Sequence, residues 1–177
     1  GLCTALKFEQ AGWDILGSDV FPSYVDSINT KTLHSKEPDV DQALRSSTRL
    51  RATLDMREVL NHADLIFILV ATPTAAGEEA YDTTTLSKVL SDISELRPVK
   101  KHIVICSTVM PGYIAKTGSF LLEGCDGCTL SYNPEFIAQG EIMKGLAEPD
   151  VVLIGEGSQD AGDILQCIYE ESTHNEP

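Results

Sequence analysis

The sequence predicts an α/β fold with a doubly wound, mostly parallel sheet. Segments of helical and strand-like periodicity alternate along the whole chain, an order that favours parallel strands joined by right-handed crossovers. Two short apolar runs, Leu65–Ala71 and 103–106, are bounded by polar residues. Continuous apolar runs of this length are typical of strands that are buried on both faces.

Local signals place the expected helices. Gly12 stands where a C-cap glycine ends the first helix, and Pro22 fits the first turn of the second. Leu86, Val89, Leu90 and Ile93 form one apolar stripe of a later helix. The expected helices span residues 2–11, 22–29, 56–63, 83–96, 114–123 and 160–170, with a weaker helical stretch at 38–44.

The expected strands are short and fall between these helices. The first ends in an acid, Asp19, and the two apolar runs supply the central pair. We expect strands at residues 14–19, 50–54, 64–72, 102–107, 128–132 and 151–154.

The chain of 177 residues suits one domain, and its 42% hydrophobic and 23% charged residues are ordinary for a soluble globular protein. Its acidity is not ordinary, because 27 Asp and Glu against 13 Lys and Arg give a formal charge of −14. This balance argues against a nucleic-acid-binding or anionic membrane surface, since both need basic side chains. An acidic surface is also a general solubility feature, so it excludes partners without naming one.

Nothing in the sequence indicates a membrane span or a signal peptide, because no apolar run approaches ~18 residues and no basic segment begins the chain. The five cysteines, an odd number in contexts that look buried, fit a reducing cytoplasm better than a disulfide framework. Cys125 and Cys128 have CxxC spacing, but a zinc site needs a second ligand pair and the four histidines are scattered. We therefore expect no metal site and interpret this segment as a turn.

Polar residues gather directly after the expected strands. In parallel α/β sheets ligands bind outside the carboxyl ends of the strands, so these positions are the candidate site. They are Asp19, Val70–Thr74, Ser107–Gly112 and Asn133–Glu135.

Asp19 lies 18 residues after Gly1 (19 − 1 = 18). In dinucleotide-binding βαβ units, an acid about 20 residues beyond the glycine motif accepts hydrogen bonds from the adenosine ribose. Its charge would repel a 2′-phosphate, which favours NAD over NADP. The alternative is an aspartate that ends a strand and caps the helix at Pro22.

The glycine motif G-x-G-x-x-G is almost absent. Gly1 fits its last glycine, which permits close packing of helix and strand, but the preceding strand and two glycines are not in the sequence. We therefore expect a sheet that lacks its first strand, in a chain that is an excerpt of a longer protein.

Hydroxyls and one carboxylate supply the candidate chemistry. Thr72-Pro73-Thr74 forms a rigid turn whose hydroxyls can cap a helix or meet a ribose or phosphate oxygen, and a purely structural turn is the alternative. The hydroxyl of Thr108 can orient a water or a substrate hydroxyl. Glu135 has apolar neighbours in sequence, which suits general acid/base work, with helix capping as the alternative.

With these residues assembled, the chain resembles the UDP-glucose/GDP-mannose dehydrogenase family, the NAD-dependent nucleotide-sugar dehydrogenases. The match runs from Gly1 to about residue 170. The matching stretches, in order, are GLCTALKFEQAGWDILGSDV, KEPDVDQAL, DLIFILVATPT, ICSTVMPG and NPEFIAQGEIMKGLAEPDVVLIG.

The resemblance implies a Rossmann-type NAD-binding domain over residues 1–170, followed at 171–177 by a frayed tail or the start of an interdomain linker. It implies oxidation of a sugar C6 alcohol to the acid in two NAD-linked steps, through a cysteine thiohemiacetal and thioester. The partners implied are a nucleotide-sugar substrate, a C-terminal substrate domain and, for the full-length form, further copies in a homo-oligomer.

The resemblance also assigns roles to residues. Thr108 and Glu135 become the water-positioning and acid/base pair, and the backbone from Glu135 through Phe136, Ile137 and Ala138 to Gln139 lies along the sugar. Gln139 lies near the nicotinamide. The implied NAD contacts are Gly1, Asp19, Val70, Ala71, Thr72, Pro73, Thr74, Ser107, Thr108, Val109 and Gln139.

The sequence departs from the family pattern at several positions. Gln139 replaces the usual glutamate, and Tyr24 stands where a lysine or arginine is common. The family's nucleophilic cysteine would follow residue 177, and Cys167 is in the wrong context to replace it, so we expect this stretch alone not to complete the oxidation. The alternatives are a non-catalytic nucleotide-binding or interaction module, and a Rossmann dehydrogenase of the 3-hydroxyacid type.

Overall fold

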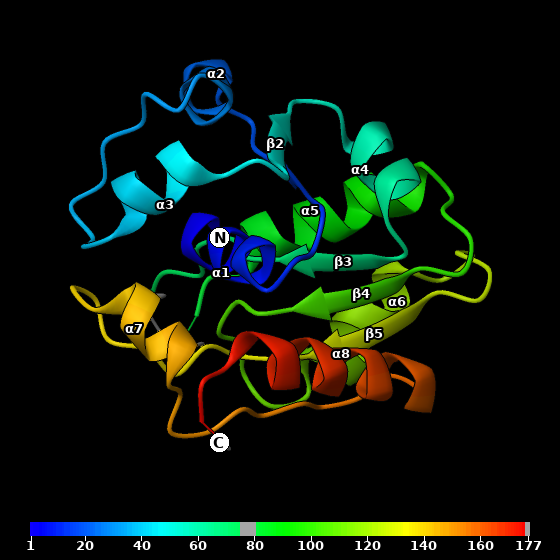
Figure 1. Cartoon of the computed structure of the whole chain (residues 1–177). Coiled ribbons are helices and arrows are strands. Elements are labelled where there is room, and N and C mark those ends of the chain that lie inside the picture. Colours follow the sequence, from blue (N-terminus) through cyan, green and yellow to red (C-terminus); the bar gives the residue numbers. More distant parts are fainter. Residues whose placement is uncertain (75–80, 176–177) are drawn as a thin grey trace. The chain divides into compact units, whose positions relative to one another are not determined.

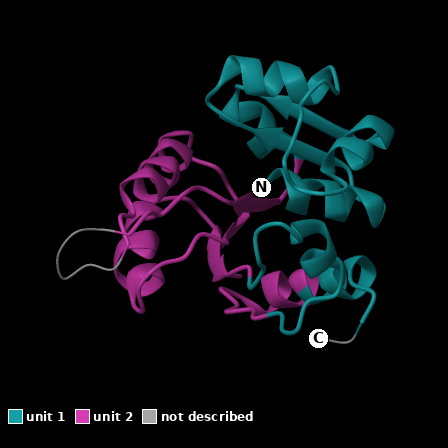
Figure 2. Cartoon of the chain, turned by 90° about the vertical axis from the view of Figure 1, so that its left-hand side faces the viewer, with its two compact units in different colours: residues 1–62, 136–152, 166–177 teal, residues 63–135, 153–165 magenta. Residues whose placement is uncertain are grey.

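A computed structural model describes residues 1–74 and 81–175 of the chain, in which helices and strands alternate (Figure 1). The chain forms two compact units, shown in Figure 2. Unit 1 comprises residues 1–62, 136–152 and 166–177, and unit 2 comprises residues 63–135 and 153–165. Both units are therefore assembled from segments that lie far apart in the sequence.

The strands are parallel, as the sequence predicts. In unit 1, β1 (Ile15–Ser18) pairs with β2 (Leu50–Thr53). In unit 2, β4 (His102–Ile105) lies between β3 (Leu65–Ile68) and β5 (Thr129–Tyr132). Within the described residues the strands thus form two separate parallel sheets, one in each unit.

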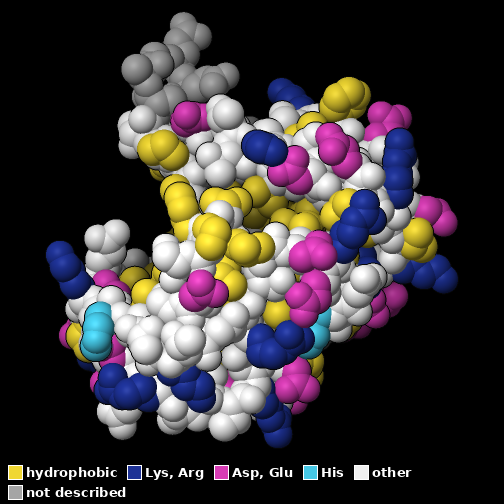
Figure 3. All heavy atoms as spheres, turned by 90° about the horizontal axis from the view of Figure 1, so that it is seen from above, with side chains coloured by type: hydrophobic (Ala, Val, Ile, Leu, Met, Phe, Trp, Pro, Cys, Tyr) yellow, Lys and Arg dark blue, Asp and Glu magenta, His cyan; other side chains and the backbone are white. Residues whose placement is uncertain are grey.

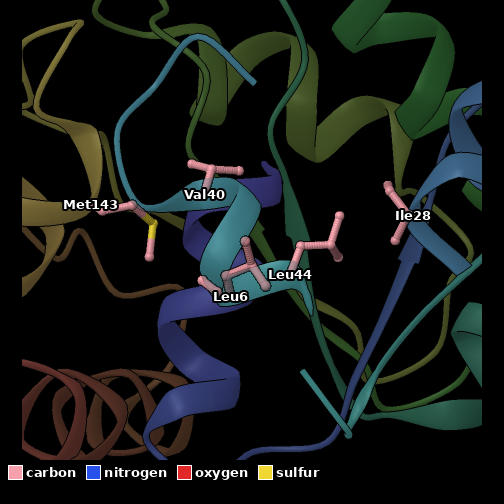
Figure 4. Close-up of a cluster of buried hydrophobic side chains, with 6 residues drawn as sticks. Leu6, Ile28, Val40, Leu44 and Met143 are labelled. Atoms are coloured by element: carbon pink, nitrogen blue, oxygen red, sulfur yellow. The ribbon is translucent and has the colours of Figure 1, made fainter. Parts of the chain in front are cut away.

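Unit 1 is held together by one apolar cluster that draws side chains from four helices (Figure 4). Each of these helices buries an apolar stripe, and burial of this kind is the main stabilising force in a small α/β unit. The helices are α1 (Leu2–Gln10), α2 (Pro22–Asn29), α3 (Val40–Ser46) and α7 (Ile142–Ala147). Their buried members are Leu6, Ile28, Val40, Ala43, Leu44 and Met143.

Helix α4 (Met56–His62) completes the first stretch of unit 1 and contacts both β1 and β2.

A lysine is buried on α1 in the same unit. Lys7 is only 6% exposed, and burial lowers the pKa of its amine, with the charge of Glu148 acting in the opposite direction. The Lys7 Nζ lies 3.3 Å from Nε2 of His174, whose backbone N–H donates to the Ala147 carbonyl at 2.7 Å. The end of the chain is therefore attached to α1 and α7.

These contacts bear on the expected tail at 171–177. Helix α8 (Gln159–Ser172) continues to Ser172, and the Asn175 side-chain amide donates to the Pro149 carbonyl at 2.9 Å. Hydrogen bonds thus connect the described part of this segment to the rest of unit 1, whereas residues 176–177 lie outside the described residues.

Unit 2 is built around β4, which is buried on both faces. Val104 and Cys106 pack with Leu165 of α8, and the alternate residues Ile103 and Ile105 are fully buried on the opposite side. Helix α5 (Thr84–Glu95) presents the predicted apolar stripe, in which Leu86, Leu90 and Ile93 are fully buried and Val89 is half-buried.

The helix expected at 114–123 has a different form. Residues Ile114–Gly118 make a π-helical turn that is followed by α6 (Ser119–Leu121). A methyl group at Gly118 would lie 2.6 Å from the Leu130 side chain, so glycine permits this turn to lie close against β5. The wider π turn was not predictable because it depends on this packing.

The strand expected at 151–154 is absent from the described structure. The chain instead runs antiparallel to the end of β5, where Tyr132 and Gly155 exchange backbone hydrogen bonds of 2.8 and 2.7 Å. The Asn133 side-chain amide donates a hydrogen bond to the Leu153 carbonyl, so backbone pairing does not extend the strand ladder there.

Helix α7 was not predicted from the sequence.

The surface carries interspersed charges of both signs on the face seen in Figure 3. Among the described residues, no helix is long and apolar enough to cross a membrane.

Gly157 provides a test of the packing against β5. Its N–H donates to Ser131 Oγ at 3.0 Å, and a methyl group there would overlap the Leu130 backbone carbonyl. We expect Gly157→Ala to destabilise the protein by about 1–3 kcal/mol, because backbone must shift. Gly155→Ala is the matched control, since its methyl group would lie 3.4 Å from the Tyr132 side chain. Chemical denaturation of both variants measures the difference, and equal free energies of unfolding would contradict it.

Candidate functional site

The carboxyl ends of the three strands of unit 2 lie in line. Ile68, Ile105 and Tyr132 are register partners across the three strands, so the residues that follow them emerge at one edge of the sheet. The structure thereby brings together the predicted segments Val70–Thr74, Ser107–Val109 and Asn133–Glu135. The predicted residues Gly1, Asp19 and Phe136–Gln139 belong to unit 1.

Ser107 joins the ends of β3 and β4. Its side chain is 7% exposed, and its Oγ accepts the Val70 N–H at 3.0 Å and donates to the Val70 carbonyl at 2.7 Å. The hydroxyl therefore satisfies both backbone groups of Val70, which the strand ladder leaves unpaired there. Because the hydroxyl is used in this way, the predicted contact of Ser107 with a dinucleotide would be made by the Ser107 backbone. The side chain would contribute indirectly, through the residues that it positions.

Val70–Pro73 has no regular secondary structure, and Thr74 forms an antiparallel bridge with Tyr81. The Pro73 carbonyl accepts the Asp82 N–H at 2.8 Å, a second contact between the same two segments. Within the described residues the Thr72 and Thr74 hydroxyls make no hydrogen bond.

Thr108 is exposed and Val109 is half-buried at the end of β4. The Thr108 hydroxyl makes no hydrogen bond to any described residue, in contrast to its neighbour Ser107. A hydroxyl in this state can donate to and accept from a bound water or substrate hydroxyl.

The end of β5 is fixed by a buried amide. Asn133 is 1% exposed, its backbone N–H donates to the Ile105 carbonyl at 2.9 Å, and its side chain donates to the Leu153 carbonyl at 2.9 Å. Asn133 therefore sets the direction of the chain two residues before Glu135, which is half-buried.

Cys106 is not among the residues predicted for the site, although the charge of Glu135 acts on its thiol. Burial raises the pKa of the Cys106 thiol, and the negative charge of Glu135 raises it further. The thiol therefore stays protonated at neutral pH and packs as an apolar group. Burial also raises the pKa of the Cys167 thiol, and the charges of neighbouring acidic residues raise it further.

The CxxC segment makes a turn. Cys125 Sγ contacts the Ser94 carbonyl at 3.9 Å, and Cys128 Sγ contacts the Pro98 carbonyl at 3.5 Å. The two sulfur atoms therefore connect the turn to the last turn of α5 and to the segment that follows this helix. No group of three potential metal ligands occurs among the described residues.

In unit 1, Asp19 follows β1 and makes a local turn. Its Oδ1 accepts the Phe21 N–H at 3.0 Å, immediately before α2. The carboxylate has a second oxygen that accepts no hydrogen bond from the described residues, so the capping and ribose-binding interpretations are compatible. Burial raises the pKa of the Tyr24 hydroxyl, and the negative charge of Asp19 raises it further.

Gly1 precedes the first turn of α1 and accepts the Ala5 N–H at 2.9 Å.

Gln139 and Gly140 form an exposed turn before α7. Gly140 has φ +94°, a left-handed conformation that glycine adopts without strain. The carboxylate of Glu37 accepts the Gly140 N–H at 2.8 and 3.0 Å and the Ile142 N–H at 3.4 Å. Glu37 is not among the predicted site residues, although it lies in KEPDVDQAL, one of the stretches that resemble the family.

Before this turn, the chain passes through Phe136, which is 56% exposed, and Ile137, which packs against Gly145 of α7. A methyl group at Gly145 would lie 2.9 Å from the Ile137 side chain, so a glycine here permits the close contact.

These features define a dinucleotide-binding α/β domain, with an acid after β1 and free hydroxyls at the ends of parallel strands. Residues 1–173 match the model of the UDP-glucose/GDP-mannose dehydrogenase family, NAD binding domain. The chain belongs to this family, and it corresponds to the NAD-binding domain.

Curated relatives support the same assignment. The chain is 30% identical to a GDP-mannose 6-dehydrogenase of Pseudomonas savastanoi pv. phaseolicola over 172 residues, covering 90% of this chain and 39% of the relative. It is 29% identical to a UDP-glucose 6-dehydrogenase of Rickettsia bellii, covering 99% of this chain and 41% of the relative. The chain therefore spans well under half the length of these relatives.

Solved structures agree. The chain superimposes on a ternary complex of GDP-mannose dehydrogenase from Pseudomonas aeruginosa with a TM-score of 0.88 at 28% identity, covering 97% of this chain and 42% of that one. A UDP-glucose dehydrogenase from Pyrobaculum islandicum gives 0.85 at 28% identity, with the same coverages. A 3-hydroxyisobutyrate dehydrogenase from Salmonella typhimurium, at a TM-score of 0.60 and 18% identity, shares the fold alone.

Ser107 and Thr108 provide a matched pair of hydroxyl deletions at this edge. We expect Ser107→Ala to lower the free energy of unfolding by about 1–3 kcal/mol, because it leaves the Val70 N–H and carbonyl without their partner. Thr108→Ala should change it by less than about 0.5 kcal/mol, since its hydroxyl is exposed. Urea denaturation of both variants measures the effect. A larger loss for Thr108→Ala would contradict the bridging role of Ser107.

Proposed function

We propose that this chain is the NAD-binding part of a nucleotide-sugar 6-dehydrogenase that oxidises the C6 alcohol of a UDP- or GDP-sugar to the acid with two NAD. The observation that carries the proposal is the alignment of three strand ends that present the Thr108 hydroxyl and the Glu135 carboxylate at one edge. The family match supplies the reaction class.

The chemistry of the polar groups fits NAD. Asp19 offers a carboxylate oxygen to the two hydroxyls of the adenosine ribose, and its charge disfavours a 2′-phosphate. The Thr72 and Thr74 hydroxyls and the backbone of Val70–Thr74 would contact ribose or phosphate oxygens, with Ser107 holding this segment in place. When bound, NAD supplies the oxidant for both steps.

Thr108 and Glu135 would handle the water and the protons. Glu135 would hold and move a proton at its carboxylate, and the Thr108 hydroxyl would orient the water whose oxygen enters the acid product. The backbone from Glu135 to Gln139 would lie along the sugar, and the Gln139 amide near the nicotinamide offers hydrogen bonds without a charge.

The nucleophilic cysteine of the proposed reaction would come from outside this stretch. The raised pKa values of Cys106 and Cys167 support this, because a nucleophilic cysteine needs a stabilised thiolate. The proposal accordingly includes a C-terminal substrate domain, a full-length form that assembles into a homo-oligomer, and a cytoplasmic location.

The ribose contact is tested through Asp19 in the full-length protein. We expect Asp19→Ala to weaken NAD binding by about 1–3 kcal/mol, because a buried ribose hydroxyl loses its acceptor. Asp19→Asn keeps an acceptor for the Phe21 N–H and separates the local turn from the charge. Asp26→Ala, an exposed acid on α2, is the control. Isothermal titration with NAD measures the affinity. An unchanged dissociation constant for Asp19→Ala would contradict the proposed contact between Asp19 and the ribose.

The acid/base role is tested through Glu135. We expect Glu135→Gln to lower kcat by about 100-fold or more while NAD affinity changes little, because the amide cannot exchange the proton. Glu123→Gln, an exposed acid in the same unit, is the control. Steady-state oxidation of UDP-glucose and GDP-mannose gives the rates. Equal losses in turnover and in NAD affinity would instead favour a capping role for Glu135.

A further inference from the structure

Glu37 holds the Gln139–Gly140 turn from a distant part of the sequence. Its two carboxylate oxygens accept the Gly140 N–H at 2.8 and 3.0 Å, and one of them also accepts the Ile142 N–H at 3.4 Å. Hydrogen bonds to an ionised carboxylate are roughly twice as strong as neutral ones. Among the described residues no lysine, arginine or histidine forms an ion pair with Glu37. Its carboxylate instead accepts the hydrogen bonds of this turn.

The loop that carries Glu37 is itself braced. The Glu37 N–H donates to Ser35 Oγ at 3.1 Å, and the Ser35 N–H donates to Asp41 Oδ1 at 2.7 Å. The hydrogen bond from Ser35, together with that from His34, lowers the pKa of Asp41, which keeps it ionised. Asp41 lies in the first turn of α3, so the loop is tied to that helix.

Both partners are anchored in one apolar cluster. Val40 and Leu44 of α3 and Met143 of α7 are buried members of it (Figure 4). Glu37 lies three residues before Val40, and Gly140 three residues before Met143. The cluster therefore holds the helix ends that follow the Glu37 loop and the Gln139–Gly140 turn. Glu37 then connects the loop to the turn.

The turn needs such a restraint. Gly140 has φ +94°, and a methyl group there would meet no atom within 4 Å. There is therefore room for a side chain at this position, and glycine is favoured by the backbone angle alone. The Glu37 carboxylate is the group that selects this conformation of an exposed, permissive segment.

We propose that Glu37 is a positioning residue for the nucleotide sugar, because it holds the Gln139–Gly140 turn in the conformation that receives the sugar. This inference rests on the proposed function, in which the backbone from Glu135 to Gln139 lies along the substrate. Glu37 acts through the turn and does not contact the substrate.

Hydrogen exchange tests the contact independently of activity. In Glu37→Ala we expect the Gly140 and Ile142 amides to exchange about 10- to 100-fold faster, because charge-assisted bonds are lost. Glu37→Gln keeps one acceptor and should give intermediate rates. Glu58→Gln is the control, since it removes an exposed carboxylate in the same unit. Unchanged exchange at both amides in Glu37→Ala overturns the inference.

Kinetics of the full-length protein test the positioning role. We expect Glu37→Ala to raise KM for the nucleotide sugar about tenfold, with the affinity for NAD within about threefold of the parent. A loss of folded protein alone would lower the apparent kcat and leave KM unchanged. Gly140→Ala strains the same turn while keeping Glu37, and should raise KM in the same way.

The outcomes separate the two proposals. Faster exchange with an unchanged KM overturns the positioning role and leaves the proposed function intact. If the full-length parent oxidises no nucleotide sugar, the proposed function fails and the positioning role fails with it. The exchange rates then still decide whether Glu37 holds the turn.

Discussion

The burial of β4 on both faces is the constraint from which the candidate site follows. With Ile103 and Ile105 buried on one side and Val104 and Cys106 on the other, the chain has no position for a polar side chain between His102, where the strand begins, and Ser107, which follows its end. Beyond His102, polar groups appear only after the strand has ended. Because β3 and β5 are parallel to β4 and end in register with it, their polar residues emerge at the same edge.

At that edge the polar residues divide into those whose side chains hold the backbone and those whose side chains are more exposed. Ser107 and Asn133 are almost fully buried and use their side chains to satisfy the carbonyls of Val70 and Leu153. Thr108 and Glu135, one and two residues further along, are more exposed. A buried residue that fixes the strand end therefore precedes each candidate catalytic residue, which is how a loop side chain acquires a defined position.

Sequence alone predicted the parallel α/β fold and the strand ends because both follow from local patterns. The apolar runs fix the buried strands, and the polar residues directly after them are visible without coordinates. What the sequence did not reveal depends on contacts between distant segments. The Ser107–Val70 bridge, the π turn beside Leu130 and the Glu37–Gly140 bonds each join residues 12 or more positions apart. The missing strand at 151–154 has the same cause, since the Asn133 side chain takes a carbonyl that a strand would use.

The turn at Gln139 also gives a physical reason for the glutamine, a position where the resembled family usually has glutamate. The Gly140 N–H is occupied by the ionised Glu37, so a carboxylate lies beside the backbone of the next residue. A glutamate at 139 would add a second negative charge close to the first, in a chain whose net charge is already −14. Glutamine keeps the size and the hydrogen-bonding oxygen without that repulsion. The uncharged Gln139 side chain is therefore compatible with the Glu37 carboxylate that accepts the hydrogen bonds of the turn.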